Sequence, residues 1–323
     1  MTFLIAILEV LLVLTILLVI YLKLTNRRIE KAPLKYAMDT YLAEPDGEEG
    51  YIEREDGSRI RYLVAGSGQP IVLAHGYGGS LAAWQVLSAD LVQKGYRVIT
   101  FDQRGHEKST IGSDGIGSQE MASDYKAVLE HFDVKDGVIL GHSMGGFLLQ
   151  VFLLNHPEVV KERLKGAILM ATFAGDINRD NAQNKVQIPL IKSGILVALT
   201  KMDLFGIPFV NTLTGDHCDM GMVKGMLQVF NRINHKALIP ILQAFVEENH
   251  YDRLGEIDLP VRVIVGEKDK TTPPFHSDNM ASGIQGASLT RIPDKGHLLN
   301  WEAPEVLADA LVALAKGETI ASA

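Results

Sequence analysis

Residues 141–146 of the chain are Gly141-His142-Ser143-Met144-Gly145-Gly146, a Gly-x-Ser-x-Gly motif. An apolar run at 137–140 precedes the motif and another at 147–152 follows it, which is typical of a buried strand and then a helix. On such a sharp turn the serine is lifted clear of the backbone at the edge of a sheet, and glycines stand where side chains do not fit. The first N–H groups of the helix favour a developing negative charge at the same place. The stretch therefore predicts a strand–helix fold with Ser143 as a nucleophile.

A serine hydroxyl becomes nucleophilic when an imidazole accepts its proton and a carboxylate fixes the tautomer of that imidazole. Asp269 follows the apolar run 261–266, and His297 follows the predicted strand 288–292. Taken singly, the two residues are more simply interpreted as a turn-forming aspartate and a surface histidine. Together with the turn at Ser143, their order and their places at strand ends favour a catalytic triad of Ser143, Asp269 and His297.

Acyl chemistry also needs two backbone N–H groups that stabilise an oxyanion. The residue after the nucleophile, Met144, supplies one of them. The second is predicted at Tyr77, on the His75–Ser80 loop that follows the apolar strand 70–74. The Tyr77 side chain either lines an acyl pocket or only packs, and the sequence favours neither.

These motifs resemble those of an α/β-hydrolase of the monoacylglycerol lipase and esterase type. The resemblance rests on His75-Gly76, the segment 101–109, the Gly-His-Ser-Met-Gly-Gly turn, and the Gly-Glu-Lys-Asp and Gly-His pairs at residues 266–269 and 296–297. It covers about residues 50–318 and implies the chain order Ser, acid, His. One position departs from the pattern, because similar enzymes have Arg-Gly-His-Gly where this chain has Glu107. If the glycine has a positive φ, Glu107 either carries strain or lies in a different turn, and a solvated turn glutamate is the simpler interpretation.

The serine excludes the haloalkane dehalogenases and epoxide hydrolases that the pattern otherwise resembles, since these have an aspartate at the turn. Carbon–carbon bond hydrolases, thioesterases, acyltransferases and cofactor-free perhydrolases share the same triad and stay open. A catalytically silent binding module on a membrane is a more remote alternative. The motifs do not separate these functions, because the pocket decides the substrate.

Residues 2–22 are apolar at almost every position, and Glu9 is the only charged residue among them. At 1.5 Å per residue such a helix spans about 30 Å, the thickness of the hydrocarbon core of a bilayer. No basic start or Ala-x-Ala site marks a cleaved signal peptide. Basic residues then outnumber acids up to Lys35. By the positive-inside rule, we expect a single-pass membrane protein with its catalytic domain in the cytoplasm.

The rest of the chain alternates between strand and helix patterns, which predicts an α/β fold with a mostly parallel sheet. The long interval between strands 166–171 and 261–265 predicts a helical cap over the serine. Strands are predicted at 51–55, 58–65, 70–74, 97–101, 137–141, 166–171, 261–265 and 288–292, and helices near 82–94, 119–132, 144–155, 275–283 and 304–316. The predicted organisation is a transmembrane anchor (1–22), a basic flank and linker (23–50), the first part of an α/β-hydrolase core (51–172), a helical cap or lid (173–255) and the second part of the core (256–323).

Composition agrees with an anchored enzyme. The net charge of −8 argues against nucleic-acid binding, and a single cysteine, Cys218, argues against a disulfide framework or a thiol-rich metal site. We expect a membrane-anchored serine hydrolase that cleaves carboxylic esters, of the monoacylglycerol kind, through an acyl-enzyme. The triad chemistry needs no cofactor and no metal.

Overall fold

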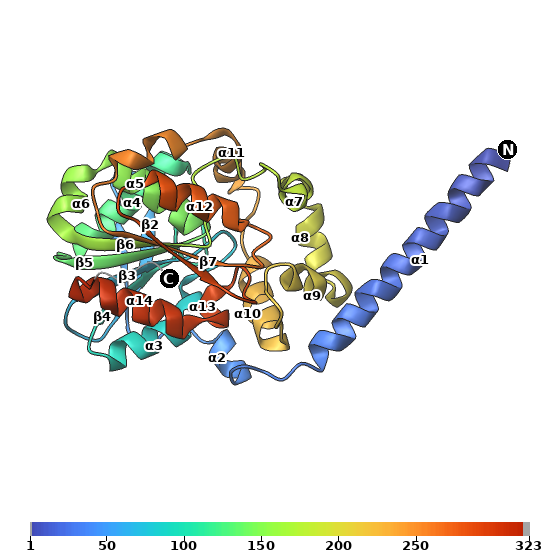
Figure 1. Ribbon diagram of the computed structural model, residues 1–323, viewed down its shortest axis with the longest axis horizontal. Helices are drawn as coiled ribbons and strands as arrows, with labels where there is room; N and C mark the ends of the chain where they lie inside the picture. Colours follow the sequence, from blue (N-terminus) through green and yellow to red (C-terminus); the bar gives the residue numbers. More distant parts are fainter. Residues whose placement is uncertain (1, 319–323) are drawn as a thin grey trace.

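The computed structural model describes residues 2–318 (Figure 1). Met1, in the predicted anchor, and residues 319–323, in the predicted second part of the core, lie outside the described residues. Within residues 2–318 the strands are β1 (Glu48–Glu53), β2 (Arg59–Ala65), β3 (Pro70–Ala74), β4 (Arg97–Phe101), β5 (Gly137–His142), β6 (Leu164–Met170), β7 (Val261–Gly266) and β8 (Ser288–Ile292). The helices are α1 (Thr2–Glu30), α2 (Met38–Leu42), η1 (Leu81–Trp84), α3 (Gln85–Gln93), α4 (Ser118–His131), α5 (Met144–Asn155), α6 (Pro157–Arg163), α7 (Ala182–Lys192), α8 (Ile195–Thr200), α9 (Asp203–Asn211), α10 (Met220–Phe230), α11 (Ile239–Glu247), η2 (Tyr251–Glu256), α12 (Pro274–Gly283), α13 (Leu299–Glu302) and α14 (Pro304–Lys316).

The strands form one sheet in the order β1-β2-β4-β3-β5-β6-β7-β8. The pairs β1–β2 and β2–β4 are antiparallel, and all neighbouring pairs from β4 to β8 are parallel. Every residue of β5 and of β7 is buried, as expected for parallel strands with helices on both faces. The predicted mostly parallel sheet is confirmed, and each predicted strand is present with ends shifted by a few residues.

Two apolar cores lie on the two faces of the sheet. Along β3, Ile71 and Leu73 face the core formed with α3 and α14, whereas Val72 and Ala74 face the core formed with α4 and α5. This alternation is the two-residue period of a strand. Because β3, β5, β7 and β8 are parallel, the loops that leave their carboxyl ends lie at the same edge of the sheet.

Helices α7 to α11 occupy the interval between β6 and β7, where the sequence predicts a cap. In Figure 1, α7, α8 and α9 lie on the side of the molecule from which α1 projects. Gly194, in the left-handed conformation, separates α7 from α8, whereas Pro189 and Pro208 lie inside α7 and α9 and do not end these helices. Among the described residues, only α1 is long and apolar enough to cross a membrane, by length and composition.

Helix α1 continues to Glu30, beyond the predicted end of the anchor at residue 22. The side chains of Leu22, Asn26 and Ile29 are buried and spaced four and three residues apart, so they share one helix face, and α1 contacts α9. The Asn26 side-chain amide donates a hydrogen bond to the Asp203 carbonyl oxygen over 2.9 Å. The last turns of α1 are therefore part of the folded domain.

Residues 36–50, where we expected a linker, are also structured. They include α2 and the start of β1, and Tyr41 in α2 is only 2% exposed. Tyr41 packs against the glycines of α10 and orders the segment, which the sequence predicts only as part of the flank and linker at 23–50.

Two isoleucines of α1 test whether the end of the helix belongs to the domain. We expect Ile29→Ala to lower the free energy of unfolding in detergent by about 2 kcal/mol, because the side chain is 1% exposed and its removal leaves a cavity. Ile20→Ala, at a position that is 49% exposed, should change the free energy of unfolding by no more than about 0.5 kcal/mol. Equal midpoints of thermal unfolding for the two variants would contradict the docking of this end.

Candidate active site

Ser143 lies on the turn between β5 and α5. Its φ of 53° and ψ of −118° put it in a strained conformation, as expected for a nucleophile on a strand-to-helix turn. The turn needs its flanking glycines: a Cβ on Gly145 would lie 2.6 Å from the carbonyl oxygens of Ala74 and His75, and one on Gly141 would lie 2.5 Å from the Gly145 oxygen. The backbone around Ser143 therefore lies directly against the end of β3.

Asp269 and His297 are in contact, each on a loop at the carboxyl edge of the sheet. The His297 Nδ1–H donates to Asp269 Oδ2 over 2.8 Å, which leaves Nε2 as the ring nitrogen that accepts a proton. The other carboxylate oxygen accepts hydrogen bonds from the backbone amides of Thr271 and Thr272, over 2.8 and 2.9 Å. The Thr272 hydroxyl adds a hydrogen bond of 2.8 Å to Asp269 Oδ2. The carboxylate is thus held in one orientation beneath the imidazole.

Ser143 and His297 line the same pocket. The Ser143 hydroxyl makes no hydrogen bond to a residue within 2–318, so the predicted Ser–His contact is not formed directly in this structure. The two residues are linked through His142, whose Nε2–H donates to the His297 carbonyl oxygen over 2.9 Å and whose ring lies 4.8 Å from the His297 ring. Burial lowers the pKa of His142 well below its usual range, so this second imidazole stays neutral beside the first.

The amides of Tyr77 and Met144 donate no hydrogen bond to any described residue, so both are available to an oxyanion. The loop that carries Tyr77 approaches the turn closely, because a Cβ on Gly76 would lie 3.0 Å from the Ser143 Cβ. The Tyr77 side chain lines the pocket, and its hydroxyl donates to Nδ1 of His235 in the cap over 2.8 Å. The structure thus selects the lining role for this side chain.

Two neutral histidines support the loop at residues 75–80. His75 Nε2 accepts from the Gln103 amide over 2.9 Å, and His106 Nε2 accepts from the Gly78 amide over 3.4 Å. Burial lowers the pKa of His75 to about 3 and that of His106 to about 4. Both rings therefore remain hydrogen-bond acceptors at neutral pH.

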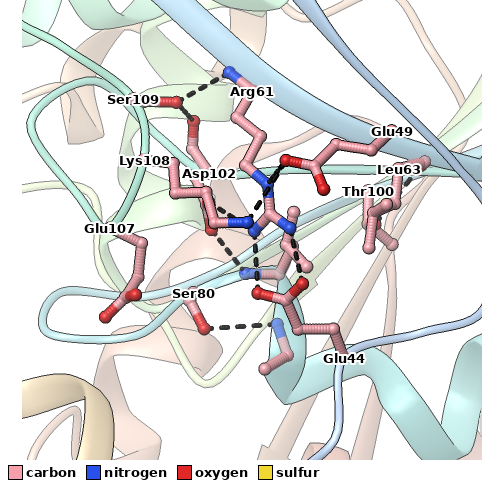
Figure 2. A network of polar contacts seen from close by, with 12 residues as sticks. Glu44, Glu49, Arg61, Leu63, Ser80, Thr100, Asp102, Glu107, Lys108 and Ser109 are labelled. Atoms are coloured by element: carbon pink, nitrogen blue, oxygen red, sulfur yellow. Dashed lines mark hydrogen bonds and ion pairs between the residues drawn. The ribbon is translucent and has the colours of Figure 1, made fainter.

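Two acidic residues that the sequence analysis missed hold the loops of the site. Asp102 Oδ1 accepts from the Leu81 amide over 2.9 Å, and the same carboxylate contacts the buried Arg61 (Figure 2). Glu302 accepts from the amides on both sides of His297, those of Gly296 over 3.1 Å and Leu298 over 3.2 Å. Burial raises the pKa of Asp102 to about 6 and also raises the pKa of Glu302. No motif signals these roles, because they depend on backbone groups that meet only in the fold.

Glu107 has a φ of 44°, so it occupies the left-handed conformation that suits the glycine of similar enzymes. Its carboxylate forms a two-point contact with the Arg232 guanidinium, over 3.3 and 3.1 Å, and its side chain is 14% exposed. Our simpler expectation of a solvated turn glutamate was therefore wrong: the residue is strained and joins the loop after β4 to the cap.

The pocket holds about 1140 Å³ of empty space, its open mouth included. Its walls come mainly from apolar side chains of the cap, and the loop containing Tyr77 adds that tyrosine together with His75, Ser80 and two glycines. Within the cap, Phe209 and Met226 line the pocket, whereas Met222 is buried in the core and Met202 is exposed. Among residues 2–318 there is no cluster of three His, Cys, Asp or Glu side chains placed to hold a metal ion.

The sheet, the turn at Ser143 and the Asp–His pair define the α/β-hydrolase class of enzymes. A family model described as alpha/beta hydrolase fold matches residues 69–189. BpoC of Mycobacterium tuberculosis, which carries the name of a non-heme bromoperoxidase, is 30% identical over 257 residues, which cover 78% of this chain and 96% of BpoC. The chain therefore belongs to the α/β-hydrolase family.

Two further similarities involve different named activities. The 2-hydroxy-6-oxononadienedioate/2-hydroxy-6-oxononatrienedioate hydrolase of Escherichia coli is 29% identical over 261 residues, which cover 76% of this chain and 86% of that protein. The solved structure of the esterase EaEST from Exiguobacterium antarcticum has a TM-score of 0.72 at 24% identity. The similarity covers 83% of this chain and 100% of EaEST. The superfamily expected from the motifs is thereby confirmed, and the relatives within it carry the names of different activities.

The close packing at the turn predicts a large effect for a small substitution. We expect Gly145→Ala to lower the free energy of unfolding by about 1–3 kcal/mol, because the added Cβ meets two backbone oxygens that cannot move independently. Gly255→Ala is the matched control, since its Cβ would meet a single atom at 3.7 Å and the position has no positive φ. The check is urea unfolding; a Gly145→Ala midpoint equal to that of the control would show that the turn is looser than described.

Proposed function

We propose that this protein is a serine hydrolase that cleaves carboxylic esters through an acyl-enzyme. The observation that carries the proposal is the Asp269–His297 contact of 2.8 Å at the wall of the pocket that also contains Ser143 on its strained turn. Ser143, His297 and Tyr77 line this cavity, and Met144 follows Ser143 directly in the chain. This is the set of groups that acyl transfer requires.

The reaction follows from the roles of these groups. His297 Nε2 accepts the Ser143 proton as the hydroxyl oxygen bonds to the ester carbonyl carbon, and the amides of Tyr77 and Met144 stabilise the oxyanion. His297 returns the proton to the leaving alcohol, and Asp269 stabilises the imidazolium in between. Water, with His297 as its base, then releases the carboxylic acid and restores Ser143.

We further propose a lipid-derived ester such as a monoacylglycerol as the substrate class. The apolar lining of the pocket supports a long acyl chain, and the flexible Met226 allows the wall to adapt to it. The resemblance to monoacylglycerol lipases points to the same class.

Helix α1 supports delivery of such a substrate from a membrane. In the proposed arrangement, residues 1–22 form a single-pass anchor and the flank at 23–50 begins on the cytoplasmic side. The core at 51–172 and 256–323 and the cap at 173–255 then lie in the cytoplasm. Val186, Ile195 and Met202 of the α7–α9 region are each more than half exposed. Figure 1 shows helices α7, α8 and α9 on the side of the molecule from which α1 projects. An apolar surface beside the anchor is suited to contact with the bilayer.

A second candidate function is hydrolysis of a carbon–carbon bond, which the similarity to the E. coli 2-hydroxy-6-oxononadienedioate/2-hydroxy-6-oxononatrienedioate hydrolase favours. The same triad would serve there, with a keto-enol acid in place of an ester. The name of BpoC suggests a related alternative in which hydrogen peroxide replaces water and the acyl-enzyme yields a peracid.

A panel of p-nitrophenyl esters from acetate to palmitate, together with monoolein, tests the ester proposal on detergent-solubilised protein. We expect kcat/KM to rise with acyl-chain length and to fall by about 10⁴-fold or more in Ser143→Ala, since the nucleophile is lost. Ser88→Ala, at a buried serine of α3 outside the pocket, is the matched control.

Turnover of acetate alone would replace the lipid substrate by a small ester. Absence of serine-dependent turnover of every ester would reject the proposal; turnover of a keto-enol acid would then support the carbon–carbon hydrolase, and its absence the silent binding module. Ser143-dependent peracid formation with hydrogen peroxide would support the BpoC-like alternative.

Removal of residues 1–21 tests the anchor while it keeps the docked turns of α1 that begin at Leu22. We expect kcat/KM for soluble p-nitrophenyl butyrate to stay within about twofold, because the pocket is unchanged. Turnover of monoolein in vesicles should fall at least about tenfold, because the enzyme is no longer concentrated at its substrate. An equal effect on both substrates would contradict delivery from the membrane.

A further inference from the structure

The segment that joins α1 to the sheet, residues 31–44, is here called the strap. It lies N-terminal to the residues that the family model matches, and it crosses the cap beside α10. One of its side chains, Tyr41, lines the same pocket as Ser143. The strap therefore contributes to the candidate active site although it connects two other parts of the chain.

Tyr41 is fixed from three sides. Its hydroxyl donates to Asp219 Oδ2 over 2.9 Å, and its ring meets that of Trp301 edge-on at 5.7 Å. A Cβ on Gly221 would lie 2.2 Å from the tyrosine ring, and one on Gly225 would lie 2.9 Å from the Tyr41 carbonyl oxygen. Tyr41 therefore fits against α10 only because Gly221 and Gly225 have no side chains.

Asp219 joins the strap to the cap more broadly. It is the N-cap of α10, where Oδ1 accepts from the Met222 amide over 2.9 Å. Its other oxygen accepts from the Lys35 amide of the strap over 2.9 Å, as well as from Tyr41. The carboxylate is completely buried, so leaving these donors unpaired would cost stability.

The other end of the strap is held by a buried guanidinium. Glu44 makes a two-point contact with Arg61, one arm of which measures 2.8 Å, and the Arg61 side chain is completely buried (Figure 2). Arg61 also contacts Glu49 and Asp102, and Asp102 holds the Leu81 amide just after the loop that contains Tyr77. The strap is therefore anchored to the same network that supports the predicted oxyanion site.

We propose that Tyr41 is a specificity-determining residue: with Trp301 and Gly225 it forms the wall of the pocket that limits the size of the acyl chain. The proposal rests on the proposed ester hydrolysis for its substrate, and on the strap geometry for its location. It assigns to the segment after α1 a direct part in substrate selection.

The test compares p-nitrophenyl esters that share a leaving group and differ in acyl chain. Tyr41→Ala should raise the ratio of kcat/KM for dodecanoate over butyrate at least about tenfold, because a large ring is removed from an apolar wall. Tyr41→Phe keeps the ring, loses the bond to Asp219, and should leave the ratio within about twofold of the unsubstituted protein. Tyr51→Ala, at a half-buried tyrosine of β1 outside the pocket, is the matched control.

Tyr41→Leu supplies the measurement if the alanine variant does not fold, with an expected smaller shift in the same direction. Binding of hexanoate and dodecanoate, measured by calorimetry, gives a readout that needs no turnover. A protein that hydrolyses no ester would overturn the proposed function, while a shift in acid affinity toward dodecanoate in the Tyr41 variants would still support the wall. Unchanged chain-length preference in both turnover and binding would overturn the role of Tyr41.

Discussion

The backbone contact between the turn at Ser143 and the end of β3 is the constraint on which the site depends. Gly145 has no space for a Cβ because the carbonyl oxygens of Ala74 and His75 occupy it. Next to it Ser143 has a positive φ, and the loop that carries Tyr77 comes within contact distance of Ser143 at Gly76. The parallel sheet makes the contact available, because β3 and β5 are direct neighbours that end at the same edge.

Buried carboxylates then fix the loops around this contact by accepting backbone N–H groups. Asp269 accepts from the amides of Thr271 and Thr272, and Glu302 accepts from those on both sides of His297. Asp102 and Asp219 do the same for η1 and for the strap. A charge-assisted bond to a backbone amide is stronger than a neutral one and directs a loop without filling the pocket with side chains. Burial makes these carboxylates costly, which the raised pKa of Asp102, about 6, reflects. The loops around the apolar pocket are thus held by buried carboxylates that bind backbone N–H groups.

Much of the fold and of the candidate site could be predicted from the sequence, because local patterns determine the strands and the turn at Ser143. Continuous apolar runs locate the buried parallel strands, and the motif around Ser143 contains its own turn and helix start. Asp269 and His297 were found by their place after strands, and the structure brings them into contact. Glu302 and Asp102 were missed because each of them holds backbone amides, and no sequence motif marks such a partner. The Leu81 amide is also 21 residues away from Asp102 in the chain. The strap was taken for a linker because Tyr41 depends on two glycines of α10 that lie about 180 residues later, as the Tyr41–Asp219 separation of 178 shows.

These long separations also have a consequence for biosynthesis. Asn26 and its partner Asp203 are 177 residues apart in the chain. At about 5–20 residues per second, a ribosome makes the second of them about 9–35 s after the first. During that interval the end of α1 and Tyr41 have been synthesised, but their partners in α9 and at the start of α10 have not. The end of α1 and Tyr41 therefore reach their final places only after the cap has been made.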